Sequence, residues 1–283
     1  MARTRRRGRS GGAVAWVPVL IGIVAWTASQ AAAAWLSDPP LHVAARETAA
    51  PEADLALVLA VDASASMSRD ELGVQRQGYV AAFRHPDVVA AIAFHAAIAV
   101  AYVEWAGPND QTVVVPWTVV TDASDAALFA ARLAEAPLSP RFNAPPWQTG
   151  TSISNALLFS ADLFSEAPPW AMRVIDISGN GTNNSGGPLG AARASVLGRG
   201  VTVNGLPIVV PRPYRPEVAI DAYYEDCVIG GPGAFALAVN DAADLEGSIR
   251  RKIVLEIAGM PASVVPAAQW ATEARIDCAN AGT

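Results

Sequence analysis

The sequence predicts a doubly wound α/β fold, with a mostly parallel central sheet and helices on both of its faces. Residues 54–61 form an uninterrupted apolar run, which is typical of a central strand that is covered on both sides. Strand-like and helix-like segments then alternate along the chain, as they do in βαβ units. Polar residues follow directly after two of the apolar runs, at the carboxyl edge where open α/β sheets bind ligands.

The other strands can be placed from their apolar patterns. We expect them at 97–105, at 113–120, from 174 to the glycines at 179 and 181, and at 201–209. Pro116 lacks an amide donor, which places the 113–120 strand at an edge of the sheet.

Helices are expected between these strands. The helix that follows residue 68 has Leu72, Tyr79, Val80 and Phe83 on one face. Further helices are expected after residue 151, at 122–136, at 187–200 and at 241–258. Arg250, Arg251 and Lys252 in the last helix are interpreted as a solvated face near its end, where cations complement the helix dipole.

The N-terminal segment indicates export. Five arginines in the first nine residues precede the uncharged stretch 13–28 and an alanine run at 31–34, as in a secretory signal. The alternative is an uncleaved anchor, because 13–36 is long enough to span a bilayer. We therefore expect a signal or anchor at 1–34, a linker at 35–53, one domain at 54–258 and a tail at 259–283. The domain would be periplasmic, secreted or held at the membrane by the N-terminal segment alone.

The charge balance argues against nucleic acid as a partner. Five of the 20 basic residues and none of the 26 acidic residues lie in the first 34 positions, so the mature chain would have a net charge of −11. A chain this acidic has no electrostatic footprint for a phosphate backbone.

Asp62, Ser64 and Ser66 follow the first strand at every second position. One carboxylate and two hydroxyls form a set of hard oxygen ligands that suits Mg²⁺, Mn²⁺ or Ca²⁺ better than zinc. The alternative is structural: Asp62 ends the strand and a hydroxyl caps the next helix. A capping box at Ser68 and Glu71 fits that alternative.

Two later segments carry polar residues at equivalent places. Gly150 and Thr151 open a helix, so the Thr151 hydroxyl is available to cap or to bind a metal. Asn180 lies between two glycines where the 174 strand breaks. Because the carboxyl ends of parallel strands share one edge, we expect these residues to gather near Asp62.

Together the three segments resemble the von Willebrand factor type A family over residues 54–258. The resemblance implies a Rossmann-like sheet with one antiparallel edge strand and a metal-ion-dependent adhesion site. Its ligands would be Asp62, Ser64, Ser66, Thr151 and Asn180. Segments at 102–105, 115–118, 204–208, 227–235 and 250–252 are most similar to a bacterial branch, domain of unknown function 1194.

Asn180 departs from the family pattern, in which the third loop usually supplies an Asp. One negative charge near the ion is lost, so metal binding should be weaker. A bound Mg²⁺, Mn²⁺ or Ca²⁺ would keep more positive charge for an Asp or Glu of a protein partner. The alternative is a site that no longer binds metal.

Cys227 and Cys278 are the two cysteines of the chain. An even count in an exported protein suggests a disulfide, which would close a loop of about 50 residues and stabilise the fold by about 4 kcal/mol. The alternative is two free buried thiols.

We expect a binding domain and not an enzyme. Ser64 or Ser66 could be a hydrolase nucleophile, but no Gly-x-Ser-x-Gly elbow surrounds either one. Neither His85 nor His95 is an obvious base for them. The expected function is metal-bridged protein–protein interaction. A metal-independent interaction module is the first alternative and a serine hydrolase the second.

Overall fold

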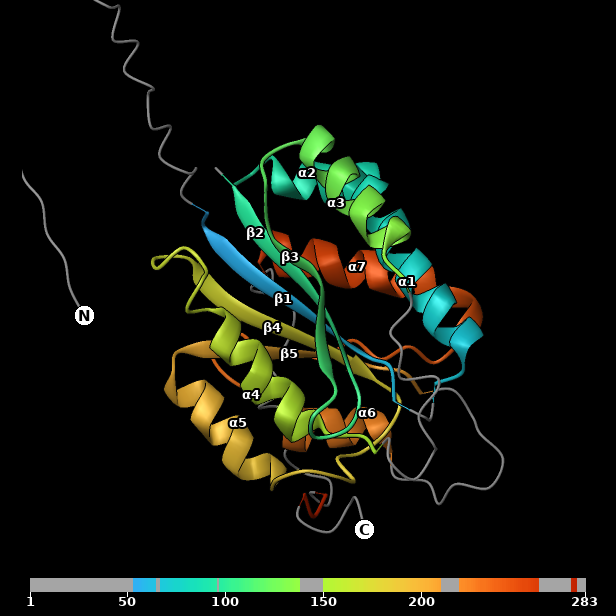
Figure 1. The fold of residues 1–283 in the computed structure, drawn as a ribbon, viewed down its shortest axis with the longest axis vertical. Coiled ribbons are helices and arrows are strands. Elements are labelled where there is room, and N and C mark those ends of the chain that lie inside the picture. The colour runs from blue at the N-terminus through green and yellow to red at the C-terminus, as the bar shows by residue number, and fades with distance from the viewer. Residues whose placement is uncertain are drawn as a thin grey trace, which may run out of the picture. The chain divides into compact units, whose positions relative to one another are not determined.

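A five-stranded sheet in the order β3-β2-β1-β4-β5 forms the centre of the domain (Figure 1). The structure is a computed structural model that describes residues 53–64, 67–95, 97–137, 150–209, 219–259 and 276–278. By its internal contacts the chain divides into residues 1–47 and 48–283, and every described residue belongs to the second unit. The expected N-terminal signal, the linker except for its last residue, 53, and most of the tail lie outside the described residues.

The strands are β1 (Leu55–Asp62), β2 (Ile98–Trp105), β3 (Gln111–Val120), β4 (Met172–Gly179) and β5 (Val201–Pro207). β1 pairs in parallel with β2 and β4, and β4 pairs in parallel with β5. β3 runs antiparallel at the edge, where its pairing with β2 shifts between Val100 and Tyr102. The predicted fold class is confirmed, including the edge position of the strand that contains Pro116.

Helices cover both faces of the sheet (Figure 1). On one face lie α1 (Arg69–Arg84), α2 (Pro86–Ile92), α3 (Ala123–Glu135) and α7 (Leu245–Ala258). On the other lie α4 (Ile153–Leu163), α5 (Leu189–Gly198) and α6 (Ile220–Tyr223), which continues as a π-helical turn at Tyr224–Val228.

The two faces of β1 explain its continuous apolar run. Leu55, Leu57 and Leu59 face the α1 side of the sheet, and Ala56 and Val58 face the α4 side. All eight residues of the strand are buried. A central strand of this kind has no solvent face, which explains why its first seven residues, 55–61, are all apolar.

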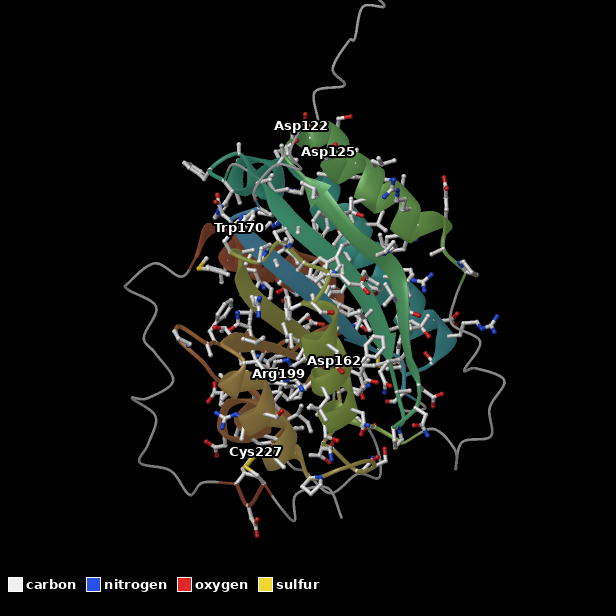
Figure 2. The ribbon with its side chains drawn as sticks, turned by 60° about the vertical axis from the view of Figure 1, so that its left-hand side comes forward. Asp122, Asp125, Asp162, Trp170, Arg199 and Cys227 are labelled. Atoms are coloured by element: carbon white, nitrogen blue, oxygen red, sulfur yellow. A yellow bond between two sulfur atoms is a disulfide. The ribbon has the colours of Figure 1, made fainter. Side chains whose placement is uncertain are left out.

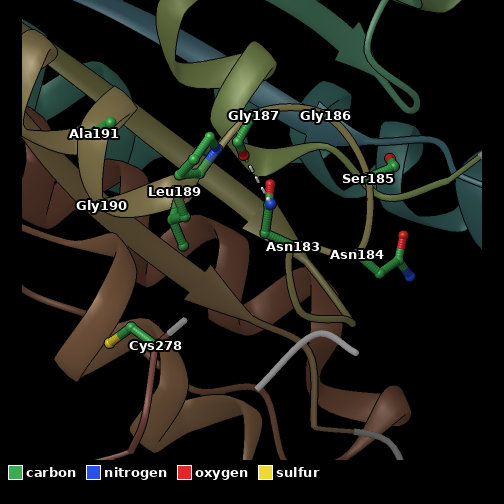
Figure 3. A pocket seen from close by; sticks show the side chains of 10 residues that line it. Asn183, Asn184, Ser185, Gly186, Gly187, Leu189, Gly190, Ala191 and Cys278 are labelled. Atoms are coloured by element: carbon green, nitrogen blue, oxygen red, sulfur yellow. Dashed lines mark hydrogen bonds between the residues drawn. The ribbon is translucent and has the colours of Figure 1, made fainter. Parts of the chain in front are cut away.

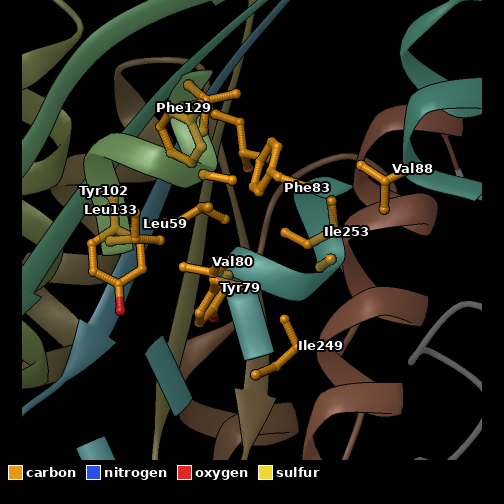
Figure 4. Close-up of a cluster of buried hydrophobic side chains, with 14 of the residues drawn as sticks. Leu59, Tyr79, Val80, Phe83, Val88, Tyr102, Phe129, Leu133, Ile249 and Ile253 are labelled. Carbon is orange, nitrogen blue, oxygen red and sulfur yellow. The ribbon is translucent and has the colours of Figure 1, made fainter. Parts of the chain in front are cut away.

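Aromatic rings fill the core beneath α1 and α3 (Figure 4). Phe83 and Phe129 lie with ring centroids 4.5 Å apart, and Tyr79 packs edge-on against Tyr102 at 5.4 Å. The face that was predicted for the first helix is therefore the buried one.

Local sequence signals set the helix ends. The Asp122 side chain accepts a hydrogen bond from the Ser124 amide at 2.8 Å and caps α3 (Figure 2). α2 was not predicted; Pro86 begins it and the His85 side chain accepts from the Asp87 amide. The helix expected at 241–258 starts with a 3-10 turn, Ala242–Asp244, before α7.

A disulfide joins Cys227, in the π-helical turn, to Cys278, with their Cα atoms 5.5 Å apart. Nearby, the Ile276 amide donates to an Asp226 carboxylate oxygen at 3.0 Å. Residues 276–278 are thus tied to the domain beside α6. Within the described residues, no helix is both long and apolar enough to cross a membrane.

Candidate metal site

The first loop begins where β1 ends, at the carboxyl edge of the sheet. Asp62 is fully buried, and its Oδ1 atom accepts a hydrogen bond from the Ser64 amide at 2.7 Å. The Ser64 carbonyl in turn accepts from the Met67 amide at 2.9 Å, which closes a turn. Ser64 is also buried, so the loop folds inward over the strand end. Ser66, the third predicted residue of this loop, lies outside the described residues.

The capping role belongs to Ser68 and not to Ser64. Ser68 accepts from the Glu71 amide, and the Glu71 carboxylate accepts from the Ser68 amide at 2.7 Å. This is the predicted capping box, and it satisfies the start of α1. Helix capping therefore does not account for the hydroxyl of Ser64.

The second loop brings Thr151 to Ser64. The Thr151 hydroxyl donates to the Ser64 hydroxyl oxygen at 3.2 Å, although the two residues are 87 positions apart. Thr151 is buried, and the side chain that caps α4 is that of Ser152. The Thr151 hydroxyl therefore points to Ser64 in the first loop and does not cap α4.

A third stretch of chain, Asn183–Asn184, fixes the Thr151 loop. The Asn184 side-chain oxygen accepts from the Thr151 amide at 2.7 Å, and the Asn183 side-chain oxygen accepts from the Ser154 amide at 2.9 Å. In the other direction, the Asn184 amide donates to the Thr151 carbonyl at 2.9 Å. Neither asparagine was predicted as part of the site, although they lie three and four positions after Asn180 and shortly before the Gly-Gly-Pro sequence at 186–188.

The same stretch borders a pocket of about 610 Å³ in front of α5 (Figure 3). Gly186, Gly187 and Leu189 line it together with Cys278. Ser185 also lines the pocket, and an added Cβ at Gly150 would lie 2.3 Å from its Oγ atom. The loop thus packs tightly on Gly150, next to Thr151.

Asn180 follows β4 at the same edge of the sheet. It is half-buried, and its amide nitrogen donates to the sulfur of Met67 at 2.8 Å. Asn180 therefore reaches the first loop through Met67, while Asp62, Ser64 and Thr151 are connected to one another directly.

Tyr224 is a further residue near the site, and it was not predicted from the sequence. Its side chain comes from the π-helical turn and is fully buried. A Cβ atom added to Gly179 would lie 2.7 Å from the Tyr224 hydroxyl oxygen and 2.9 Å from Asp62 Oδ2. Only glycine fits at this position, because both oxygens approach its Cα atom. No local sequence signal marks the tyrosine, since 162 positions separate it from Asp62.

A buried ionic cluster lies deeper in the fold. The Lys252 ammonium group donates to Asp176 Oδ1 at 2.6 Å and also pairs with Glu256. Asn204 donates to the second Glu256 oxygen at 2.6 Å. Lys252 is fully buried in the middle of α7, so its interpretation as part of a solvated face at the helix end was wrong. Its positive charge is needed in the core because the carboxylates of Asp176 and Glu256 are buried beside it.

Burial and mutual charge interactions shift the pKa values of Glu256 and Lys252 in this cluster. Burial raises the pKa of Glu256 from 4.5 to about 7, Lys252 opposes this rise and Asp176 adds to it. Burial alone would lower the pKa of Lys252, but the charges of Asp176 and Glu256 outweigh it and raise that pKa. Two carboxylates thus share one ammonium group, and Asp176 lies inside β4 as part of this cluster.

The residues at the edge fit a hard divalent cation. Buried carboxylate and hydroxyl oxygens from two loops converge, and Gly179 leaves space beside the carboxylate. Among the described residues, no group of three or more His, Cys, Asp and Glu side chains could hold a metal. A cation here would therefore depend on Asp62 together with hydroxyl groups.

The two histidines among the described residues, His85 and His95, lie away from Ser64. His95 Nδ1 is 3.5 Å from an Asp54 carboxylate oxygen, at the start of β1, whereas Ser64 follows the end of that eight-residue strand. Such a strand is about 26 Å long. His85 lies between α1 and α2, where it contacts an Arg250 nitrogen at 2.9 Å. Neither histidine is placed to activate Ser64 as a nucleophile.

The sheet order, the helices on both faces and the loops at the carboxyl edge define a von Willebrand factor type A-like domain. More narrowly, the chain belongs to the family described as "Protein of unknown function (DUF1194)", whose sequence model matches residues 52–261. The resemblance identified from the sequence is confirmed. A comparison with curated proteins gives no match.

Solved structures with this fold include two proteins of known origin. The pilus adhesin SpaC from Lactobacillus rhamnosus GG is 13% identical with a TM-score of 0.52, over 72% of this chain and 30% of the adhesin. Proximal thread matrix protein 1 from the mussel byssus, with a zinc-occupied MIDAS motif, is 15% identical with a TM-score of 0.52, over 74% of this chain and 50% of that protein. The chain thus spans at most half the length of these proteins, and the likeness concerns the fold.

Proposed function

We propose that this domain is an exported protein-interaction module that captures an acidic side chain of a protein partner through a divalent cation. Asp62, Ser64, Ser66 and Thr151 would hold the cation, Mg²⁺ or alternatively Mn²⁺ or Ca²⁺, with Asn180 as a weak outer contributor. The observation that carries the proposal is the hydrogen bond between the Ser64 and Thr151 hydroxyls beside the buried Asp62 carboxylate.

The chemistry of the ligand set supports an acidic partner. A bound divalent cation would supply a positive charge to which a partner's carboxylate can bind. Asp62 is the one carboxylate that the proposed set contributes, so its single negative charge leaves part of the metal's charge uncompensated. The hydroxyl oxygens of Ser64 and Thr151 are uncharged, so as ligands they would not reduce the positive charge that remains on the metal.

Export is supported by the N-terminal arginines, the apolar stretch at 13–28 and the disulfide between Cys227 and Cys278. The fold is also found in a pilus adhesin and in a byssus matrix protein. The acidic charge of the chain argues against nucleic acid as the partner.

The test uses Mn²⁺ as the metal and a short peptide with one Asp as the partner's side chain. Enhanced water-proton relaxation reports water molecules on bound Mn²⁺, and a carboxylate that replaces water lowers the enhancement. We expect the Asp peptide to lower it and a peptide with Asn instead to leave it unchanged. Equal effects of the two peptides, or no enhancement with the protein alone, would contradict the proposal.

The contact between Asn180 and Met67 favours a second candidate, a metal-independent interaction module. The side-chain nitrogen of Asn180 donates to the Met67 sulfur at 2.8 Å, so a contact within the protein holds this side chain without a metal. In that case a chelator would leave the binding of a physiological partner unchanged.

A further inference from the structure

The geometry points to Tyr224 as an additional positioning residue of this site: its hydroxyl donates a hydrogen bond through one bridging water to the Asp62 carboxylate and orients it toward the cation. This inference rests on the proposed metal site. Its consequence is that the π-helical turn after α6, which no metal ligand occupies, contributes to metal affinity.

The first support is an unsatisfied buried group. Tyr224 is 0% exposed, and its hydroxyl has no hydrogen-bond partner among the described residues. Buried hydroxyl groups are nearly always hydrogen-bonded, and exceptions call for an explanation. A hydrogen bond to a group of the candidate metal site would explain this buried hydroxyl.

The second support is where the hydroxyl points. The Tyr224 hydroxyl oxygen and Asp62 Oδ2 both approach the Cα atom of Gly179, at 2.7 and 2.9 Å from the position that a Cβ would take. Asp62 Oδ1 already accepts from the Ser64 amide. A donor at each of the two carboxylate oxygens prevents rotation of the group and keeps a buried negative charge solvated by dipoles.

The third support is the way the chain holds the tyrosine. The ring passes over Gly205 of β5, where an added Cβ would lie 2.7 Å from Tyr224 Cδ1. Cys227 in the same turn is anchored to Cys278. π-helical turns are rare and frequently occur at functional sites.

The test replaces Tyr224 with Phe, which removes the hydroxyl and keeps the ring. Mn²⁺ affinity is measured for the full chain and for Asn180→Asp, each with and without Tyr224→Phe. We expect about tenfold weaker binding in both backgrounds, as for the loss of one hydrogen bond to a charged group. The melting temperature of each metal-free variant is measured beside it, so that a loss of metal affinity is distinguished from a loss of the fold.

A matched control is Tyr102→Phe, since Tyr102 is equally buried but packs on the opposite face of the sheet. It should leave Mn²⁺ affinity unchanged. A second readout is the near-ultraviolet difference spectrum, in which Mn²⁺ should perturb a tyrosine of the wild type and not of Tyr224→Phe.

Three outcomes are decisive. Affinity of Tyr224→Phe within twofold of its parent, or an equal loss in Tyr102→Phe, would overturn the role of Tyr224 and leave the proposed function intact. Binding in Asn180→Asp but not in the wild type would contradict the proposed function, and the comparison in the Asn180→Asp background would still decide the role of Tyr224. Binding in neither background would overturn both.

Discussion

Gly179 shows how one residue can limit the geometry of the site. It ends β4, and its missing side chain lets Asp62 from β1 and Tyr224 from the π-helical turn approach the same point. The constraint is one of space, because atoms of both side chains come closer than 3.0 Å to the position of a Cβ. A residue that binds nothing itself thus controls where the carboxylate can lie.

We therefore predict that Gly179→Ala destabilises the domain by about 1–3 kcal/mol, the usual cost of overpacking a filled interior. Metal binding should weaken at the same time, because Asp62 must shift. Urea denaturation and a Mn²⁺ titration measure the two effects. Gly73→Ala is the control: nothing lies within 4 Å of its added Cβ in α1, so stability should rise by about 0.5–1 kcal/mol. Wild-type stability in Gly179→Ala would contradict the packing argument.

At the scale of elements, α7 is attached to β4 by charge as well as by apolar packing. Lys252 pairs with Asp176 of β4 and with Glu256 one turn further along α7, while Ile249 and Ile253 enter the core (Figure 4). A fully buried cation between two carboxylates is costly unless all three groups are paired. The helix and the strand are therefore held in one register.

This cluster predicts a pH dependence of stability. The folded pKa of Glu256, about 7, lies above its ordinary value of 4.5, so the folded state binds the proton more tightly than the unfolded state. Protonation of Glu256 therefore adds to the free energy of unfolding. This stabilisation is fully present below about pH 4.5 and is lost as the pH rises through about 7, a change of about 3 kcal/mol. The free energy of unfolding of the wild type should fall across this range relative to Glu256→Gln, which cannot titrate. Urea denaturation at each pH measures both free energies. An equal pH dependence of the wild type and Glu256→Gln would contradict the raised pKa of Glu256.

Elements that depend on local pattern could be predicted from the sequence. The apolar run of β1, the proline in β3 and the capping box at Ser68 each have a cause within a few residues. Lys252 could not be placed, because its burial depends on Asp176, which is 76 positions away. Tyr224 was missed for the same reason, since its contact with the Asp62 end of β1 exists only once the sheet has formed.

At the scale of the whole molecule, the site depends on three distant parts of the chain that one sheet edge brings together. The loops after β1 and before α4 meet through Ser64 and Thr151, and Asn180 after β4 reaches the first loop. The prediction that these segments gather was made from parallel-sheet geometry. The side-chain direction of Asn180 and the role of the 183–184 stretch depend on loop packing that no short-range pattern encodes.

The proposed metal site can be examined by calorimetric titration of the purified protein with Mg²⁺, Mn²⁺ and Ca²⁺, beside Asp62→Ala and Asn180→Asp. We predict that the wild type binds, that Asp62→Ala does not, and that Asn180→Asp binds at least about tenfold more tightly because a second carboxylate faces the ion. No binding heat with the wild type, or equal affinity in Asp62→Ala, would contradict a metal-dependent interaction site.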